Sequence, residues 1–311
     1  MPGVPKVRRR LALALAGALL FLSSRPALAL PALWTVRGPH ATVVLFGSVH
    51  LLPPGLDWQP PALAQALTSA KEIWFELPID GATAATAQKL AMEKGLLVKG
   101  DLFGRLSPAD AERLRTACAR VAVPPSLIAT MRPWLAEVTL SLAQDVQAGG
   151  AAGQGVDQQL SDHLAASIPR RAFETARQQI DFLAAAPMPE QLASLDETIA
   201  EIANDPNLYQ RVVDSWLKGD TAALRKDALE PLIKSSPGMY RRLITDRNRH
   251  WASVLARRLK AGDGVIVVVV GTAHLIGPQG VPALLRQHGF DVDGPGLEGE
   301  SAQLLPPASA H

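Results

Sequence analysis

The chain has 311 residues, enough for one large domain or two, and its formal net charge is +2. Such a small charge, without a stripe of Lys and Arg interleaved with aromatic residues, excludes nucleic acid as an expected partner. Aromatic residues make up only 5% of the chain, whereas Ala and Leu are abundant, so we expect a helix-rich protein.

The first 29 residues have the pattern of a cleavable export signal. Lys6 and Arg8–Arg10 form a positively charged start, and Leu11–Leu22 is an apolar segment too short to cross a membrane comfortably. Ala27-Leu28-Ala29 matches the A-x-A cleavage pattern, which predicts a cut after Ala29 and a mature chain that begins at Leu30. The alternative is an uncleaved N-terminal anchor.

The cysteine content supports an exported protein without disulfides. Cys118 is the only cysteine, so no intrachain disulfide can form, and we expect it to be a small buried apolar residue. No cysteine stands at the cleavage site, which argues against a lipoprotein, and no later stretch is long and apolar enough to span a membrane. We therefore expect a periplasmic or secreted bacterial protein.

The mature chain begins with a predicted hairpin. Leu33–Val36 and Ala41–Phe46 have the apolar pattern of strands, and Gly38-Pro39 between them predicts the turn. Gly47–Asp57 is expected to be a loop. Pro60–Ser69 then has the pattern of an amphipathic helix.

The next strand is predicted over Glu72–Leu77, and it contains a carboxylate close to its end. Glu76 follows an apolar run, and Pro78 comes soon after it. If the first two buried strands are neighbours, Glu76 stands beside His50 at one edge of the sheet. The alternative is an ordinary exposed glutamate.

Residues 82–262 have mostly helical patterns. Ser107-Pro108-Ala109-Asp110 predicts a helix start, with Pro in the first turn and an acidic residue behind it. Gly149–Gly155 is too short for a domain linker and indicates a mobile loop. A helix from Val156 to about Ala166 follows it.

The predicted helix over Met239–Lys260 carries polar residues where its apolar face continues. At 100° per residue, Ile244 and Trp251 lie on the same face as Arg247 and Asn248. A charged side chain on a buried face is costly unless it has a partner. Arg247 is therefore either a structural arginine paired with carboxylates or carbonyl groups, or a residue that points into a site at the edge of the sheet.

The stretch Gly264–Gly277, GVIVVVVGTAHLIG, is the strongest strand signal in the chain. Six consecutive β-branched residues, Val265–Val270, favour a strand that is buried on both faces of a helix-covered sheet. The run ends at Gly271, and His274 follows three residues later. Open α/β sheets bind their ligands beyond the carboxyl ends of such strands.

The same pattern occurs once earlier in the chain. VVLFGSVHLLPP and VVVGTAHLIGP align so that Gly47 matches Gly271 and His50 matches His274. Each copy consists of an apolar strand, Gly-x-x-His and an aliphatic pair. Two such copies, more than two hundred positions apart, are a far more specific signal than a single Gly-x-x-His. If both strands belong to one sheet, both imidazoles meet at the same edge.

On these motifs the chain resembles the TraB/GumN family of bacterial proteins, which also includes the animal Tiki metalloproteases, over Trp34–Val292. The hallmarks of that family are the paired Gly-x-x-His motifs and a glutamate after the second strand, which is Glu76 here. Further positions match the family pattern: Gly155-Val156-Asp157, Glu174-Thr175 with Gln179, Trp216 with Gly219-Asp220, and Arg247-Asn248. Phe173 stands where a leucine commonly precedes the Glu-Thr pair. The resemblance implies proteolysis as in the Tiki relatives, while most bacterial members have no known substrate.

The residue types themselves suit metal-assisted hydrolysis. The imidazoles of His50 and His274 and the carboxylate of Glu76 form a common ligand set for a catalytic divalent metal such as Mn²⁺, Co²⁺ or Zn²⁺. Such a metal activates water and polarises a carbonyl group, and Glu76 could instead be the general base. Arg247 and Asn248 could stabilise an oxyanion or hold the substrate backbone. No HExxH helix and no G-x-S-x-G motif is present.

The sequence therefore predicts an α/β (α+β) fold, with a central mixed sheet built from the N- and C-terminal parts of the chain and a long helical insertion between them. Residues 1–29 are the expected signal peptide, residues 30–297 the metallohydrolase-like domain, and residues 298–311 a disordered tail. The primary functional prediction is an exported metal-dependent hydrolase with a peptide or protein substrate.

Two other functions remain open at this point. One is a periplasmic protein that binds a metal ion or haem without turnover, and the other is a non-catalytic signalling or interaction protein. For the hydrolase, we expect the nearest polar atoms of His50, His274 and Glu76 to lie about 4–6 Å apart. The sequence predicts neither the metal nor the oligomeric state.

Overall fold

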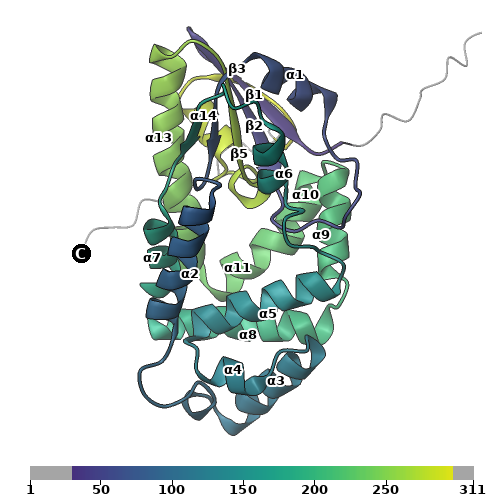
Figure 1. Cartoon of the computed structure of the whole chain (residues 1–311), viewed down its shortest axis with the longest axis vertical. Coiled ribbons are helices and arrows are strands. Elements are labelled where there is room, and N and C mark those ends of the chain that lie inside the picture. Colours follow the sequence, from purple (N-terminus) through teal and green to yellow (C-terminus); the bar gives the residue numbers. More distant parts are fainter. Residues whose placement is uncertain (1–29, 297–311) are drawn as a thin grey trace, which may run out of the picture.

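The computed structural model describes residues 30–296, so the predicted export signal and the predicted tail lie outside the described residues. A mixed sheet covered by helices forms one end of this part of the chain, and a group of helices extends from it (Figure 1). The predicted α/β architecture with a helical insertion is confirmed.

Strands from both ends of the chain build one six-stranded sheet in the order β4-β3-β5-β2-β1-β6. The strands are β1 (Leu33–Arg37), β2 (Ala41–Ser48), β3 (Ala70–Phe75), β4 (Arg170–Ala172), β5 (Gly264–Gly271) and β6 (Asp291–Asp293). β1 and β2 form the predicted antiparallel hairpin. β5 runs parallel to β2 on one side and to β3 on the other. Its residues Ile266–Val270 are all buried, as the uniform apolar run indicated.

The prediction that the first two buried strands are neighbours is wrong. β5 lies between β2 and β3, so Glu76 follows a strand that pairs with β5. The apolar run of β5 requires cover on both faces and pairing on both edges, which the centre of a helix-covered parallel sheet provides. β3 also ends at Phe75, earlier than predicted, because Pro78 and the residues before it leave the ladder.

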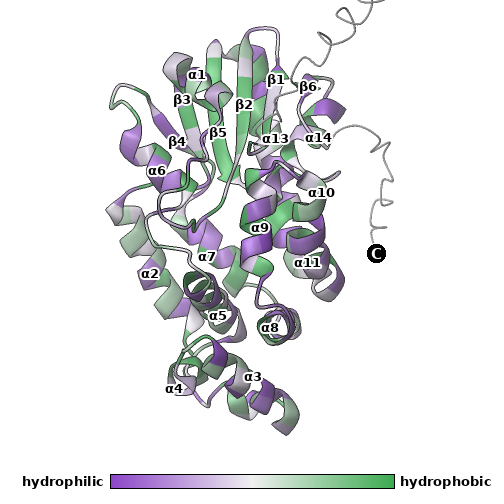
Figure 2. Ribbon diagram, turned by 90° about the vertical axis from the view of Figure 1, so that its right-hand side faces the viewer, coloured by the Kyte–Doolittle hydropathy of each residue, from purple (hydrophilic) through white to green (hydrophobic). Residues whose placement is uncertain are grey.

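The helices match the predicted helix-rich middle of the chain. They are α1 (Pro61–Ser69), α2 (Gly81–Gly95), α3 (Pro108–Arg120), α4 (Pro125–Ala129), α5 (Pro133–Gln147), α6 (Val156–His163), α7 (Ala176–Ala184), α8 (Met188–Asn204), α9 (Leu208–Leu217), α10 (Thr221–Leu224), α11 (Glu230–Ser235), α12 (Pro237–Tyr240), α13 (Asp246–Ala261) and α14 (Val281–Gln287). Figure 1 shows α13 and α14 on one side of the sheet and α1 and α6 on the other, and Figure 2 shows that the central strands are hydrophobic.

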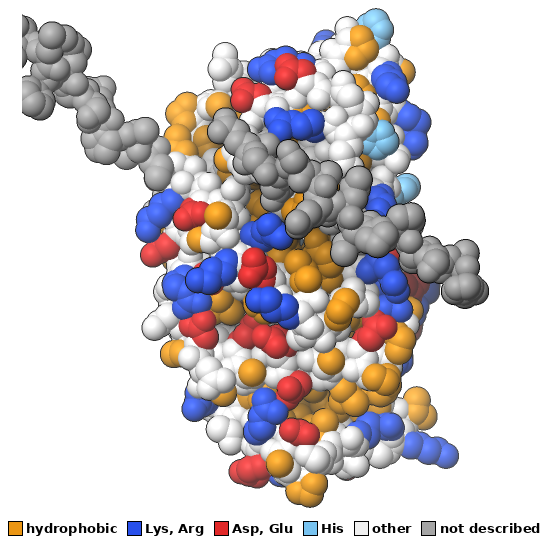
Figure 3. All heavy atoms as spheres, turned by 180° about the vertical axis from the view of Figure 1, so that it is seen from behind, with side chains coloured by type: hydrophobic (Ala, Val, Ile, Leu, Met, Phe, Trp, Pro, Cys, Tyr) orange, Lys and Arg blue, Asp and Glu red, His pale blue; other side chains and the backbone are white. Residues whose placement is uncertain are grey.

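Two apolar cores hold these layers together. The larger core surrounds the sheet and includes the buried residues of β2 and β5 with Trp216 and Trp251. The smaller core lies among α3, α5 and α8 and contains Cys118, which is fully buried as expected. On the face seen from behind, acidic and basic side chains are interspersed (Figure 3). Within residues 30–296, no helix is both long and apolar enough to cross a membrane.

The glycine-rich segment of residues 149–155 is fastened to the loop that follows β2. Ala151 forms an antiparallel bridge with Leu52, and the N–H of Val156 donates to the carbonyl of Val49 at 3.1 Å. These bonds place the start of α6 directly over the first histidine motif. α6 ends at His163, a few residues before the predicted end.

Candidate functional site

The two histidine motifs and Glu76 meet at the carboxyl-terminal edge of the parallel strands. Ser48 at the end of β2 pairs with Gly271 at the end of β5, and His50 and His274 each follow within three residues. Glu76 comes directly after β3, whose Phe75 pairs with Val269 of β5. The predicted meeting of the two motifs at one edge is therefore confirmed by the strand register.

The motif glycines allow the loops to touch. A Cβ on Gly47 would lie 2.6 Å from Oγ1 of Thr272, so a larger residue there would force the two motifs apart. The Thr272 hydroxyl donates to the carbonyl of Ser48 at 3.0 Å, and the Trp216 indole donates to the carbonyl of Gly47 at 2.8 Å. A Cβ on Gly271 would lie 3.1 Å from Oε1 of Glu76, a tight contact.

Arg247 on α13 lies at the centre of the site, and its guanidinium has a partner for each nitrogen. Nε and Nη2 donate to the two carboxylate oxygens of Glu174 at 2.8 and 2.9 Å. Nη2 also donates to Oε2 of Glu76 at 2.6 Å, and Nη1 donates to the carbonyl of Leu243 at 2.9 Å. The remaining bond joins Nη1 to Nε2 of His274 at 3.1 Å. Both readings of this buried arginine therefore apply to it: it is paired structurally, and it faces the site.

The contacts of His274 determine its tautomer. A guanidinium can only donate, so Nε2 of His274 accepts from Arg247 and the proton resides on Nδ1. Nδ1 then donates to Oδ1 of Asn248 at 2.6 Å, and Nδ2 of Asn248 donates to the carbonyl of Gln279 at 2.7 Å. Burial lowers the pKa of His274 to about 3, which keeps the imidazole neutral. The structure thus presents a neutral histidine whose Nε2 lone pair accepts from Arg247 and whose Nε2 lies 3.8 Å from Oε1 of Glu76.

Glu76 is held as a carboxylate. Its Oε1 accepts from the N–H of Gly271 at 2.7 Å, and its Oε2 accepts from Nε2 of Gln179 at 3.0 Å. Burial acts to raise the pKa of Glu76, but the electrostatic effects of His274, Arg247 and His50 and the hydrogen bond from the Gly271 N–H outweigh it and lower the pKa to about 2. Because His274 is itself neutral at ordinary pH, we attribute the lowering mainly to Arg247.

His50 stands at the mouth of the site, with its side chain 77% exposed. Its Nδ1 lies 3.6 Å from Oδ2 of Asp157 on α6, and this neighbour raises the pKa of His50 to about 9, an attraction that solvent weakens at an exposed ring. A Cβ on Gly155 would lie 2.2 Å from the carbonyl oxygen of His50, so only glycine allows α6 to start this close to the histidine. Asp157 is thereby placed to orient the ring.

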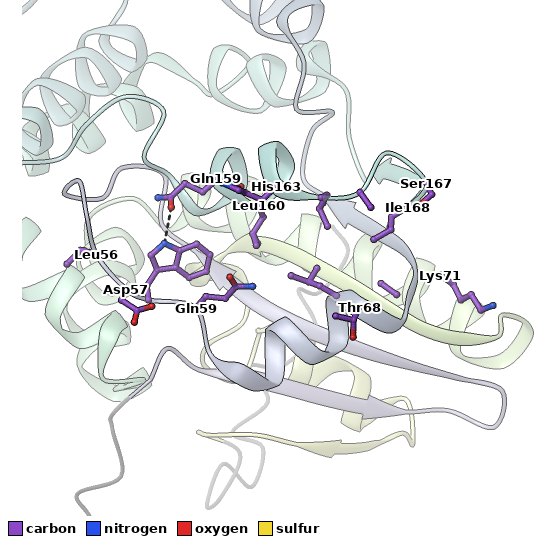
Figure 4. A pocket seen from close by; sticks show the side chains of 15 residues that line it. Leu56, Asp57, Gln59, Thr68, Lys71, Gln159, Leu160, His163, Ser167 and Ile168 are labelled. Carbon is purple, nitrogen blue, oxygen red and sulfur yellow. Dashed lines mark hydrogen bonds between the residues drawn. The ribbon is translucent and has the colours of Figure 1, made fainter.

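A pocket of about 350 Å³ connects these groups. His50, Glu76, Asp157 and Gln179 all line it, and His274 lies behind Glu76, with 3.8 Å between Nε2 and Oε1. A larger hollow of about 920 Å³ lies between α1 and α6, beside Trp58, and includes none of these groups (Figure 4).

The side chains of Glu76 and His274 are of types that bind divalent cations, but the guanidinium of Arg247 bonds to the histidine nitrogen that a cation would need. Metal-bound histidines usually have one nitrogen held by a second residue, as Asn248 holds Nδ1 of His274, and the carboxylate of Glu76 is ionised. In residues 30–296, however, no three His, Cys, Asp or Glu side chains gather closely enough to hold a metal ion. Nη1 of Arg247 takes up the lone pair of His274.

The comparison with protein families now identifies the chain. The model of the TraB/PrgY/gumN family matches residues 32–294. The chain belongs to this family. Comparisons with curated proteins and with solved structures found no match. The family match covers both histidine motifs, Glu76 and Arg247, and it confirms the resemblance that the paired motifs indicated.

Three residues of this TraB/PrgY/gumN chain have site contacts that the sequence did not reveal. Glu174, Gln179 and Asp157 matched the family pattern without an assigned role, and they contact Arg247, Glu76 and His50 respectively. Glu174 comes two residues after the end of β4, much as Glu76 follows β3, and the Glu174 N–H donates to the Glu76 carbonyl at 3.0 Å. A carboxylate after a short strand was the available signal, but the Arg-Arg-Ala sequence of β4 does not look like a strand.

Proposed function

We propose that this family member is an exported metal-dependent hydrolase that cleaves peptide bonds at the pocket that His50 and Glu76 line, with His274 behind Glu76. One observation carries the proposal. A buried, ionised Glu76 lies 3.8 Å from the inward-facing Nε2 of a neutral His274, at the strand edge where α/β sheets bind their ligands. Ionised carboxylate and neutral imidazole are the forms that a divalent metal requires, and Glu76 and His274 already have them. His50, whose pKa is raised to about 9, would have to release its proton to bind the metal.

His50, Glu76 and His274 would hold the metal. When bound, a divalent ion supplies an activated water and polarises the carbonyl group of the substrate. The chain's own residues set the site for that chemistry: Asn248 keeps the proton of His274 on Nδ1, while Gln179 and the Gly271 N–H fix the two oxygens of Glu76.

Arg247 has a second task in this proposal. Glu174 holds its guanidinium through two hydrogen bonds, which fixes the plane of the fork. If a metal bound Nε2 of His274, the Nη1 donor that now contacts it would be free to donate to the carbonyl oxygen on which charge develops during hydrolysis. A pre-oriented donor of this kind stabilises an oxyanion by about 3–4 kcal/mol.

The test is metal analysis combined with a peptidase assay on the mature protein. We expect bound or activating Mn²⁺, Co²⁺ or Zn²⁺, peptide cleavage that a chelator abolishes, and loss of both metal and cleavage in His274→Ala. His250→Ala is the matched control, because His250 is an exposed histidine on α13. Melting temperatures must accompany each measurement, since the site is buried.

Two results would contradict the proposal. Cleavage that persists in a chelator and in the His274→Ala variant would remove the metal from the reaction. An intense Soret band with no peptide cleavage would instead indicate haem binding without turnover, which is the alternative that two histidines at one edge also allow.

A further inference from the structure

A second hollow continues the pocket along the segment that follows Glu76. This hollow, of about 340 Å³, shares the lining residues Leu77, Ile79 and Gln158 with the pocket that His50 and Glu76 line. Because they share these lining residues, the two hollows adjoin each other along the segment from Glu76 to the start of α2. We call the second hollow the α2 groove; its lining residues are Leu77, Pro78, Ile79, Asp80, Gly81, Thr83, Ala84, Ala87 and Gln158.

The main chain along this groove is available for pairing. The Phe173 and Glu174 N–H groups donate to the carbonyls of Phe75 and Glu76, and the ladder of β3 with its neighbour ends there. Between residues 30 and 296, no backbone–backbone hydrogen bond uses the N–H or the carbonyl of Leu77 or Ile79. Unpaired main-chain groups next to a strand end are the feature that recognises an extended peptide by strand addition.

The walls of the α2 groove select for apolar side chains. Leu77 and Ile79 line it together with Ala84 and Ala87 of α2, and a Cβ built on Gly81 meets no atom within 4 Å. This apolar lining suits an aliphatic side chain.

One charge in the α2 groove acts against acidic ligands. The carboxylate of Asp80 caps α2 by accepting from the Thr83 N–H at 2.7 Å. It uses the first-turn donors that would otherwise attract an anion, and its own charge repels one. An acidic side chain is consequently disfavoured at this position.

We infer that the α2 groove is the substrate-binding subsite beside the reacting groups. It takes an extended peptide whose main chain pairs with Leu77–Ile79 and whose uncharged aliphatic side chain, next to the bond at Glu76, packs against Ile79 and Ala84. The cleavage of that bond rests on the proposed function, whereas the binding of the peptide does not.

A matched pair of substitutions on α2 tests the subsite. Ala84→Trp fills the groove, whereas Ala85→Trp places the same side chain on an exposed neighbour that does not line it. The probe is a dye-labelled, capped Ala-Leu-Leu-Ala peptide, with binding followed by fluorescence anisotropy and cleavage by mass spectrometry. We expect Ala84→Trp to weaken binding roughly 10- to 100-fold, which corresponds to the loss of one buried leucine side chain. Ala85→Trp should bind like the unsubstituted protein.

A second variant tests the charge preference. Asp80→Asn keeps a good helix cap and removes the negative charge. It should raise the affinity for a capped Ala-Asp-Asp-Ala peptide, relative to the leucine peptide, roughly two- to fivefold, as expected for an exposed charge pair.

The outcomes separate the subsite from the hydrolase. If the unsubstituted protein binds the leucine peptide, Ala84→Trp blocks that binding, and no cleavage occurs in added Mn²⁺, the subsite is supported and the hydrolase is contradicted. Cleavage that Ala84→Trp and Ala85→Trp carry out equally well overturns the subsite and leaves the hydrolase standing. Absence of leucine-peptide binding, or equal binding by both variants, also overturns the subsite.

Discussion

Replacing Arg247 by methionine should destabilise the protein strongly, because Arg247 neutralises two buried carboxylates. The side chains of Glu76 and Glu174 are 12% and 4% exposed, and both bond to the guanidinium, whose own side chain is 9% exposed. Arg247→Met fills a similar volume but leaves both carboxylates without their counter-charge. Removing one partner from a buried ion pair costs about 3–5 kcal/mol. For a domain of this size the melting temperature should fall by roughly 6–20 °C.

The assay is urea unfolding of the mature protein at about pH 7, followed by circular dichroism. Arg249→Met is the matched control on the same helix, because Arg249 forms only an exposed ion pair with Asp246 and should change stability by less than about 0.5 kcal/mol. The double variant Arg247→Met/Glu174→Gln removes one of the stranded charges. It should therefore be more stable than the sum of the single changes predicts, with a coupling of about 1–3 kcal/mol.

Unfolding of Arg247→Met and Arg249→Met at the same urea concentration would refute this prediction. In that case Glu76 and Glu174 do not depend on the guanidinium, and the lowered pKa of Glu76 has another cause. A large destabilisation without coupling to Glu174 would show that packing of the arginine chain, rather than its charge, stabilises the fold.

Three further predictions test other parts of the molecule. Burial raises the pKa of Glu137 to about 7, so the stability that its proton confers on the folded state is lost as the pH rises through that value. In urea titrations, Glu137→Gln should therefore raise the free energy of unfolding by up to about 3 kcal/mol near pH 8. The same substitution should change it little near pH 4. Gly155→Ala should cost about 1–3 kcal/mol, since its Cβ would meet the His50 carbonyl at 2.2 Å, while Gly81→Ala, which meets open space, should cost almost nothing in the same titration. N-terminal sequencing of the exported protein should begin at Leu30, and an intact Met1 on membrane-bound material would contradict the signal cleavage.

The parts of the fold that the sequence predicted are those with local patterns. The β-branched run of β5 is buried on both faces because six such residues in succession leave no polar face. Arg247 and Asn248 are buried because helical periodicity places them with Trp251, and this relation depends on neighbouring residues only. The repeat of the Gly-x-x-His motif located both histidines at one edge, since parallel strands align their carboxyl ends.

The parts that the sequence did not predict depend on pairings between distant segments. Strand order is one example. Nothing in the sequence of β3 indicates that its neighbour in the sheet is β5, nearly two hundred residues later, rather than β2. β4 is another, because its Arg-Arg-Ala sequence has no strand pattern and its register is set by β3. The bond between Glu174 and Arg247 follows from that register, so its detection required the folded chain.

The position of Arg247 determines how the proposed metal site should respond to substitution. Nη1 of Arg247 and a metal ion both require the single lone pair on Nε2 of His274, so they cannot occupy it together. If Arg247 supported metal binding, the site would bind metal less tightly without it. Mutual exclusion predicts the opposite: Arg247→Met frees Nε2 and leaves two carboxylates that attract a cation, so Mn²⁺ should bind more tightly by calorimetry while peptide cleavage falls about 10²–10³-fold for the lost donor. Weaker Mn²⁺ binding by Arg247→Met, at a temperature where it remains folded, would show that the guanidinium does not compete for the metal position.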